Sequence, residues 1–251
     1  MSGTGIVKHE ALTDDTKRYR YVSLSQFLSL VESKQTYVTS IRHWQDTWEA
    51  PAHQLPAERE DGKLEYPLWT IAEDMVAQSW SLHPESDALW RVYSSQKEGL
   101  VIQTSVKRFD LMKDIRYGLL APVVYFENLL EGLRQIAGDE QYSGPFQGAF
   151  LKRRAFEYEA EVRLVTLNDE RCLGKRYQDC IRISVALDPV EFIEGITVDP
   201  RSSDWYVETL QRYCARVGFK VTPTKSELYS AGVFESTGVR IRWTPVEREE
   251  D

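Results

Sequence analysis

Cysteine, histidine and long apolar runs are all scarce in this sequence of 251 residues. It holds three cysteines and four histidines, without a Cys-x-x-Cys or a His-x-x-x-His pair among them. A disulfide framework and a zinc centre are therefore not expected. No apolar run of about 18 residues occurs, and residues 1–16 lack the apolar segment of a signal peptide. We expect a cytoplasmic protein in a reducing compartment, with no membrane partner.

Two common catalytic signatures are also missing. The sequence contains neither a Gly-x-x-x-x-Gly-Lys phosphate loop nor a Gly-x-Ser-x-Gly nucleophile elbow. Acidic residues outnumber basic ones by 39 to 31, which gives a net charge of −8. This balance argues against broad electrostatic binding to nucleic acid or to an anionic membrane. What is present is a chain that is 42% hydrophobic and able to bury a core without covalent cross-links.

Hydrophobic periodicity predicts helices and strands in mixed order. Helices are predicted over residues 23–34, 105–115, 129–137, 146–154 and 204–217, and strands over 37–41, 76–82, 100–104, 123–126, 162–166, 181–187, 192–198 and 219–221. A further helix is expected between Ser86, its cap, and Gly99. Because no regular β–α–β rhythm appears, the expected class is α+β, with a mixed, mainly antiparallel sheet and helices packed around it.

No repeat, linker or low-complexity block divides the chain, so a single domain is expected. The polar residues 1–17 are interpreted as a flexible leader, residues 18–244 as the α+β domain, and residues 245–251 as an acidic tail.

The most concentrated charge lies in Glu157-x-Glu159-x-Glu161. In an extended strand the three carboxylates would lie on one side, with about 7 Å between successive Cα atoms. Like charges so placed repel, and a protein tolerates them when they bind cations, pair with basic groups or carry a raised pKa. One interpretation is a functional site. The other is neutralisation at the surface by the neighbouring Lys152, Arg153, Arg154 and Arg163.

Aromatic residues and a few polar ones accompany this run. Five of the seven tryptophans fall within residues 44–90. In the predicted strand 76–82, Ser79 and Ser81 share the face opposite Trp80. We expect Trp80 and Trp90 to support a ligand cleft from behind these two serines. Arg20 is a suitable anchor for a phosphate or carboxylate, because the guanidinium fork binds either in bidentate fashion.

Taken in order, several blocks resemble the bacterial family called domain of unknown function 2971. They are Tyr19-Arg20-Tyr21, Asp46 to Glu49, Ser79 to Ser94, Glu98 to Gln103, Tyr125, Lys152 to Leu164, and Ile193 to Ile196 with Pro200. The resemblance covers roughly residues 19 to 230, and that family has no settled activity. This sequence departs from the family pattern at Asp46-Thr47, where the family usually has Asp-Pro.

A more distant resemblance is to the arginine-type mono-ADP-ribosyltransferases, through the ordered set Arg20, Ser79-x-Ser81 and Glu159-x-Glu161. It implies that NAD is the substrate, that a macromolecule accepts ADP-ribose, and that the sheet is split. It also implies catalytic roles for Arg20, which grips NAD, for Glu159, which orients the acceptor, and for Glu161, which bonds the ribose. The expected cofactor-binding residues are Arg20, Tyr21, Ser79, Trp80, Ser81, Trp90, Tyr93 and Tyr125.

Two alternatives remain open from the sequence. Asp46, Glu49, Glu159 and Glu161 with Lys152 nearby would suit a Mg²⁺- or Mn²⁺-dependent nuclease or hydrolase. A non-catalytic interaction module would instead use the acidic run as a solvated face and the aromatics as core. The discriminating question is geometric: a small-ligand site requires Arg20, Ser81 and Glu161 to converge on one cleft.

Overall fold

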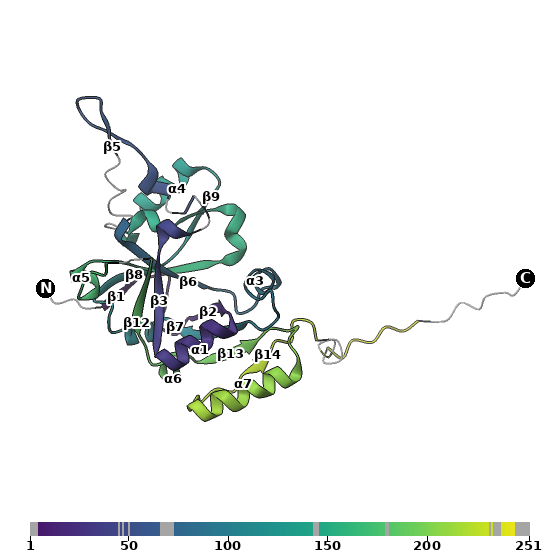
Figure 1. Cartoon of the computed structure of the whole chain (residues 1–251). Coiled ribbons are helices and arrows are strands. Elements are labelled where there is room, and N and C mark those ends of the chain that lie inside the picture. Colours follow the sequence, from purple (N-terminus) through teal and green to yellow (C-terminus); the bar gives the residue numbers. More distant parts are fainter. Residues whose placement is uncertain are drawn as a thin grey trace, which may run out of the picture.

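A computed structural model describes residues 5–44, 46, 48–49, 51–65, 73–142, 146–178, 181–230, 232 and 237–243. Over these residues one large, mostly antiparallel sheet is surrounded by helices (Figure 1). The predicted α+β class is therefore confirmed. The acidic tail at 245–251 lies outside the described residues, as does Trp69, one of the five tryptophans within residues 44–90.

The large sheet has ten strands. In spatial order, its main path runs through β1 (Gly5–Lys8), β8 (Tyr117–Pro122), β11 (Glu161–Leu167), β6 (Met75–Ser81), β2 (Lys17–Val22), β7 (Leu100–Ser105), β13 (Gly195–Val198) and β14 (Thr224–Lys225). A branch of β3 (Gln35–Ser40) and β12 (Arg182–Ala186) joins this path at β6. Two small sheets pair β9 (Val124–Phe126) with β10 (Leu151–Arg153) and β4 (Ala57–Glu58) with β5 (Leu64–Glu65).

Six α-helices are described: α1 (Leu24–Ser33), α3 (Asp87–Tyr93), α4 (Leu129–Ala137), α5 (Glu170–Leu173), α6 (Pro189–Phe192) and α7 (Asp204–Val217). Local sequence explains their starts. Ser23 forms a capping box with Gln26 at the start of α1, and Ser86 caps α3 by accepting a hydrogen bond from the Leu89 amide. Within the described part of the chain, no helix has the length and apolar character needed to cross a bilayer.

Strand β6 divides the sheet. On one edge, β11 pairs with all of β6 from Met75 to Ser81. On the other edge, the described pairings are confined to its two ends: β3 pairs at Val76 and Ala77, and β2 pairs at Ser81 alone. The sheet is consequently split beside residues 78–80, where β2 and β3 diverge. This arrangement agrees with the split sheet that the second resemblance implies.

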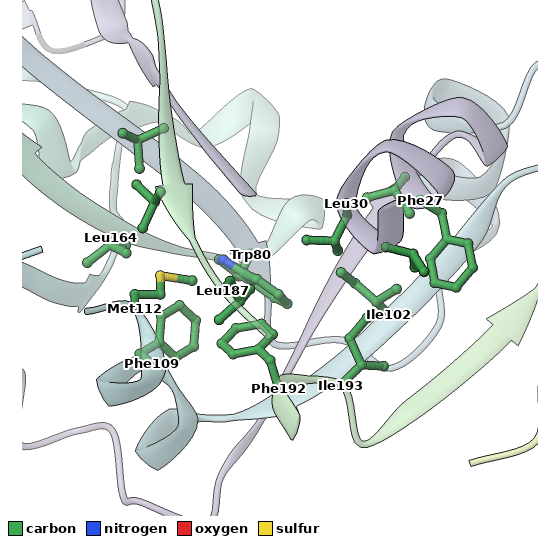
Figure 2. Close-up of a cluster of buried hydrophobic side chains, with 14 of the residues drawn as sticks. Phe27, Leu30, Trp80, Ile102, Phe109, Met112, Leu164, Leu187, Phe192 and Ile193 are labelled. Carbon is green, nitrogen blue, oxygen red and sulfur yellow. The ribbon is translucent and has the colours of Figure 1, made fainter. Parts of the chain in front are cut away.

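The main core lies on the face of β6 that carries Trp80. The Trp80 indole packs edge-on against Phe109 and Phe192, with ring centroids 5.3 and 5.7 Å apart, and Figure 2 shows Leu187 and Met112 beside them. A second apolar cluster, which includes Met75, Ala77, Phe126, Phe150 and Val165, packs on the opposite face. Ser79 and Ser81 share this opposite face, as the alternation predicts.

The structure corrects the prediction at the N-terminus. The expected flexible leader includes β1, which pairs in parallel with β8, and Ile6 and Leu12 join the core. Strand β8 itself was not predicted. Its residues Gly118 to Ala121 are buried on both faces, so they lack the alternation that marks a strand with one solvated face.

Three other segments differ from prediction. The helix expected over 105–115 is a 3₁₀ turn at Val106–Leu111, and the one expected over 146–154 is a 3₁₀ turn at Gln147–Phe150 followed by β10. The last strand lies at β14 instead of 219–221, because Phe219 packs into the core directly after the left-handed Gly218 that ends α7. Helices α4 and α7 have the predicted bounds.

Candidate functional site

A cavity of about 600 Å³ opens where the sheet splits. Eight of the predicted site residues line it: Arg20, Tyr21, Ser79, Trp80, Ser81, Tyr93, Glu159 and Glu161. They come from β2, from β6, from the end of α3, and from the 3₁₀ turn before β11 together with the first residue of β11. Residues from three distant parts of the chain thus converge on one cavity, as a small-ligand site requires.

Strand register explains part of this convergence. In the antiparallel pair of β6 and β11, Glu161 lies opposite Ser81 and Arg163 opposite Ser79. Tyr19 of β2 pairs with the same Ser81 from the other side. Residues opposite one another share a face of the sheet, so the carboxylate and the serines point into the same space.

Glu161, the first residue of β11, is buried with only 3% of its surface exposed. Its Oε1 accepts a hydrogen bond from Arg163 Nε at 2.7 Å, and its Oε2 accepts from Lys152 Nζ at 2.9 Å and Arg163 Nη2 at 3.0 Å. Burial works to raise the pKa of Glu161, but the Arg163 guanidinium, with Lys152 and a hydrogen bond from Ser79, lowers it to about 2. The carboxylate is therefore ionised at neutral pH.

Lys152, in β10, lies between three carboxylates. Its Nζ is 2.7 Å from Glu159, 2.9 Å from Glu161 and 3.2 Å from Glu49. Burial would lower the pKa of Lys152, yet the charges of Glu161 and Glu49 raise it above its ordinary value. Three carboxylates therefore face two cations, Lys152 and Arg163, and one negative charge remains when all are ionised.

The acidic run is not extended, which corrects the predicted geometry. Residues Arg154–Glu159 form a 3₁₀ turn that ends at Ala160, whose φ of 42° is left-handed. Glu157 consequently points to solvent, with 60% of its side chain exposed, and lies 3.7 Å from Arg154. For Glu157, surface neutralisation is the correct interpretation. Glu159 instead enters the cavity, where burial raises its pKa against the opposing effect of Lys152.

Arg20 is the cation of the cavity without an acidic partner. Among the described residues it makes no ion pair, and its Cζ lies 5.9 Å from the centroid of the Trp80 ring. Burial lowers the pKa of Arg20 to about 10, and the charge of Arg182 on β12 adds to the lowering. A partly buried guanidinium that has no acidic partner among the described residues is suited to an anionic ligand, because the ligand would supply the counter-charge.

Two predicted cofactor-binding residues do not line the cavity. Trp90 is fully buried and packs edge-on against Tyr21, with ring centroids 4.9 Å apart, so it supports the wall from behind. Tyr125 lies on β9, and its hydroxyl oxygen accepts a hydrogen bond from the Glu161 amide at 2.8 Å. Both residues position cavity residues instead of contacting the cavity space themselves.

Sequence reasoning missed the way in which Arg163 and Trp44 enter this site. Arg163 was interpreted as a surface neutraliser, but it is fully buried and its Cζ lies 4.7 Å from the centroid of the Trp44 ring. One sequence signal was available for Arg163: two residues after Glu161 in a strand, it must share the face of that carboxylate. No such signal exists for Trp44, which reaches the site from a distant loop.

The geometry argues against the metal-dependent alternative. Across the described part of the chain, no group of three or more His, Cys, Asp or Glu side chains is arranged to hold a metal ion. The ammonium of Lys152 occupies the centre of the carboxylates that were candidate ligands, and Asp46 pairs instead with Arg153 at 2.9 Å. A divalent cation would have to displace that buried ammonium.

Comparisons with known proteins give distant structural matches only. No protein-family model matches the chain, so membership of domain of unknown function 2971 is not confirmed. No curated protein matches it either. Among solved structures it is similar to DarT of Thermus sp. 2.9 in complex with NAD+, at 11% identity and a TM-score of 0.40, over 86% of this chain and 98% of that chain.

The same DarT in complex with ADP-ribosylated ssDNA matches at 11% identity and a TM-score of 0.38, over 85% of this chain and 94% of that chain. Its complex with carba-NAD+ matches at 11% identity and a TM-score of 0.37, over 85% of this chain and 95% of that chain. Similarities at this level assign no function. A functional proposal for the chain has to rest on its own site residues.

Proposed function

We propose that the chain binds NAD in the cavity at the sheet split, cleaves the bond between nicotinamide and ribose, and transfers ADP-ribose to a macromolecular acceptor. One observation carries the proposal: Arg20, Ser81 and Glu161, which lie far apart in the sequence, line a single cavity of about 600 Å³. That volume lies within the range of small-molecule and cofactor sites.

Arg20 supplies the group that binds the diphosphate of NAD. It is partly buried, it lines the cavity, and it makes no ion pair within the described residues. A diphosphate oxygen would replace the missing counter-charge, and the planar guanidinium can donate two parallel hydrogen bonds to it. The Trp80 ring, whose centroid lies 5.9 Å from Arg20 Cζ, attracts the guanidinium.

Glu161 supplies the charge that the reaction needs. When the glycosidic bond breaks, its electron pair goes to the nicotinamide nitrogen and positive charge develops on the ribose. An ionised carboxylate held in a buried site stabilises that charge without reorganising, as in glycoside cleavage. The negative charge left over in the cluster of Glu49, Glu159, Glu161, Lys152 and Arg163 acts in the same direction.

Glu159 is placed to act on the acceptor. Its side chain lines the cavity next to Glu161, and its pKa is raised by burial. A carboxylate in this position can orient an incoming nucleophile and take up the proton that the nucleophile loses as it bonds to the ribose carbon. The hydrogen bond from Lys152 Nζ at 2.7 Å holds Glu159 in place for this role.

The test is to incubate the protein with NAD labelled in its ADP-ribose portion, together with a cell extract that supplies acceptors. We expect release of nicotinamide, transfer of label to a macromolecule, and a heat of NAD binding in calorimetry. Glu161→Gln should lower turnover by about 100-fold to 1,000-fold, the range found when one transition-state electrostatic contact is removed. Arg20→Gln should weaken NAD binding, because the diphosphate loses its partner.

The matched control is Glu157→Gln, which removes a carboxylate of the same run that points to solvent. It should leave turnover unchanged. EDTA should also have no effect, because Lys152 already fills the centre of the carboxylate cluster. If the protein neither binds NAD nor releases nicotinamide with any acceptor source, the proposal is wrong, and an interaction module becomes the better interpretation.

A further inference from the structure

We propose that Arg163 is a positioning residue of this site: its two hydrogen bonds hold the Glu161 carboxylate in one orientation, and Glu49 holds Arg163 in turn. The inference deepens the proposed function and rests on it, because it assigns Arg163 a role in the same reaction. It concerns the direction of the Glu161 side chain, and Arg163 itself is not among the residues that line the cavity.

The contact between the two side chains is bidentate. Arg163 Nε donates to Glu161 Oε1 at 2.7 Å, and Arg163 Nη2 donates to Oε2 at 3.0 Å. Two parallel hydrogen bonds fix the plane of a carboxylate as well as its distance. Lys152, which also bonds Glu161, is a point charge shared among three carboxylates and cannot fix that plane.

Arg163 is itself held from three other directions. Its Nη2 also donates to Glu49 Oε2, and its Nη1 donates to the Ala149 carbonyl oxygen at 2.6 Å. The centroid of the Trp44 ring lies 4.7 Å from Arg163 Cζ. The guanidinium is completely buried, so no water competes for these bonds. Its orientation is thereby set before any ligand enters.

The contact that Arg163 makes with Glu161 bears on more than the stability of the fold. A buried ion pair often adds little stability, because desolvation of the two charges offsets their attraction. Here, however, the carboxylate that Arg163 holds also lines the cavity. A change of about 1 Å in the position of a catalytic group can lower a rate by about 100-fold, so the fork of Arg163 is expected to affect the rate as well as the fold.

Arg163→Lys is the first test, because lysine keeps the positive charge but cannot form the fork. We expect kcat for nicotinamide release to fall about 100-fold while KM for NAD changes by less than about twofold, because ground-state binding to Arg20 is retained. Glu49→Gln, which removes the negative charge of the outer partner of Arg163 and of one partner of Lys152, should lower kcat by about 10-fold. Arg153→Lys is the matched control: Arg153 is a neighbouring arginine that pairs with Asp46 and does not contact Glu161.

Arg163→Gln gives a second readout that does not require turnover. In protein labelled with ¹³C at the glutamate carboxyl carbons, the Glu161 signal is assigned by its absence in Glu161→Gln. Loss of the guanidinium should raise the pH at which Glu161 titrates, and the acid limb of the kcat profile should move to higher pH with it. An Arg163 that does not act on Glu161 would lower stability without moving either. The loss of kcat in Arg163→Lys, which keeps the positive charge, then separates the orientation of Glu161 from its charge.

The outcomes separate the two proposals. If the native protein turns over NAD and Arg163→Lys keeps its kcat, the positioning role is wrong while the proposed function stands. If the native protein does not turn over NAD, the proposed function fails, and an unchanged Glu161 titration in Arg163→Gln then overturns the positioning role as well. Should Arg163→Gln not fold, kcat in Arg163→Lys and Glu49→Gln decides.

Discussion

Trp48 and Trp90 carry the same indole side chain in opposite surroundings. Trp90 is completely buried between the core and Tyr21, and its Nε1 donates to Glu85 at 3.2 Å. Trp48 is 46% exposed, and the centroid of its ring lies 6.0 Å from Arg153 Cζ. Sequence position within the tryptophan-rich stretch did not distinguish them. At the scale of single residues, burial decides which indole supports the cavity wall.

This contrast gives a prediction on stability. Trp90→Ala should lower the free energy of unfolding by about 3–5 kcal/mol, because a large buried side chain is replaced by a cavity. Urea denaturation measures the change. Trp48→Ala should cost less than about 0.5 kcal/mol, the usual effect of a surface substitution. Equal losses in the two variants would mean that the burial of Trp90 does not support the fold as described.

Helix α4 and strands β9 and β10 form one unit that serves the site. Strand β9 carries Tyr125 and its parallel partner β10 carries Lys152, which pair in register and both contact Glu161. Helix α4 packs on this pair and is capped by Asn128, whose side chain accepts from the amides of Leu130 and Glu131. The position of two site residues therefore depends on how closely this helix approaches its strands.

Gly132→Ala tests that approach. In an isolated helix this change is favourable by about 1 kcal/mol. Here a Cβ at Gly132 would lie 2.8 Å from Phe126 Cβ on β9, so the helix would have to move away from the strand. Overpacking of this kind costs about 1–3 kcal/mol, and we expect a net loss of stability in urea denaturation. Glu131→Ala, at an exposed position of the same helix, should not show this loss of stability. A stabilised Gly132→Ala protein would contradict the described packing.

At the scale of the whole molecule, the buried charges couple folding to pH. The pKa of Glu161 is about 2 in the folded protein and has an ordinary value of 4.5. Between these values the unfolded chain binds more protons than the folded one, so stability rises with pH through this window. The stabilisation is fully present above pH 4.5 and is lost as pH falls toward 2.

Stability measured by urea denaturation should therefore fall steeply as pH falls from about 4.5 to about 2, following the linkage between protonation and folding. Glu161→Gln should show a flatter dependence in this window, because its side chain does not titrate. Glu157→Gln, which removes an exposed carboxylate, should keep the native slope. An unchanged slope in Glu161→Gln would mean that Glu161 is not held ionised by its neighbours.

Local sequence was sufficient wherever a segment forms its structure by itself. Helices α4 and α7 have clear apolar periodicity and end signals, and their bounds were predicted correctly. Strand β6 shows the alternation of a strand with two different faces, so Ser79 and Ser81 could be separated from Trp80. Strands β1 and β8 could not be predicted in this way, because their pairing depends on neighbours distant in the chain.

The sequence by itself determined the α+β class and the ordered set of Arg20, Ser79-x-Ser81 and Glu159-x-Glu161, because both are properties of local pattern and residue order. Only the tertiary structure decided that this set lines one cavity and that Glu157 leaves it. It alone brought Glu49 to Arg163, across 114 positions of the chain. Contacts at such separation follow from how strands pair and where the sheet splits, which no local pattern encodes.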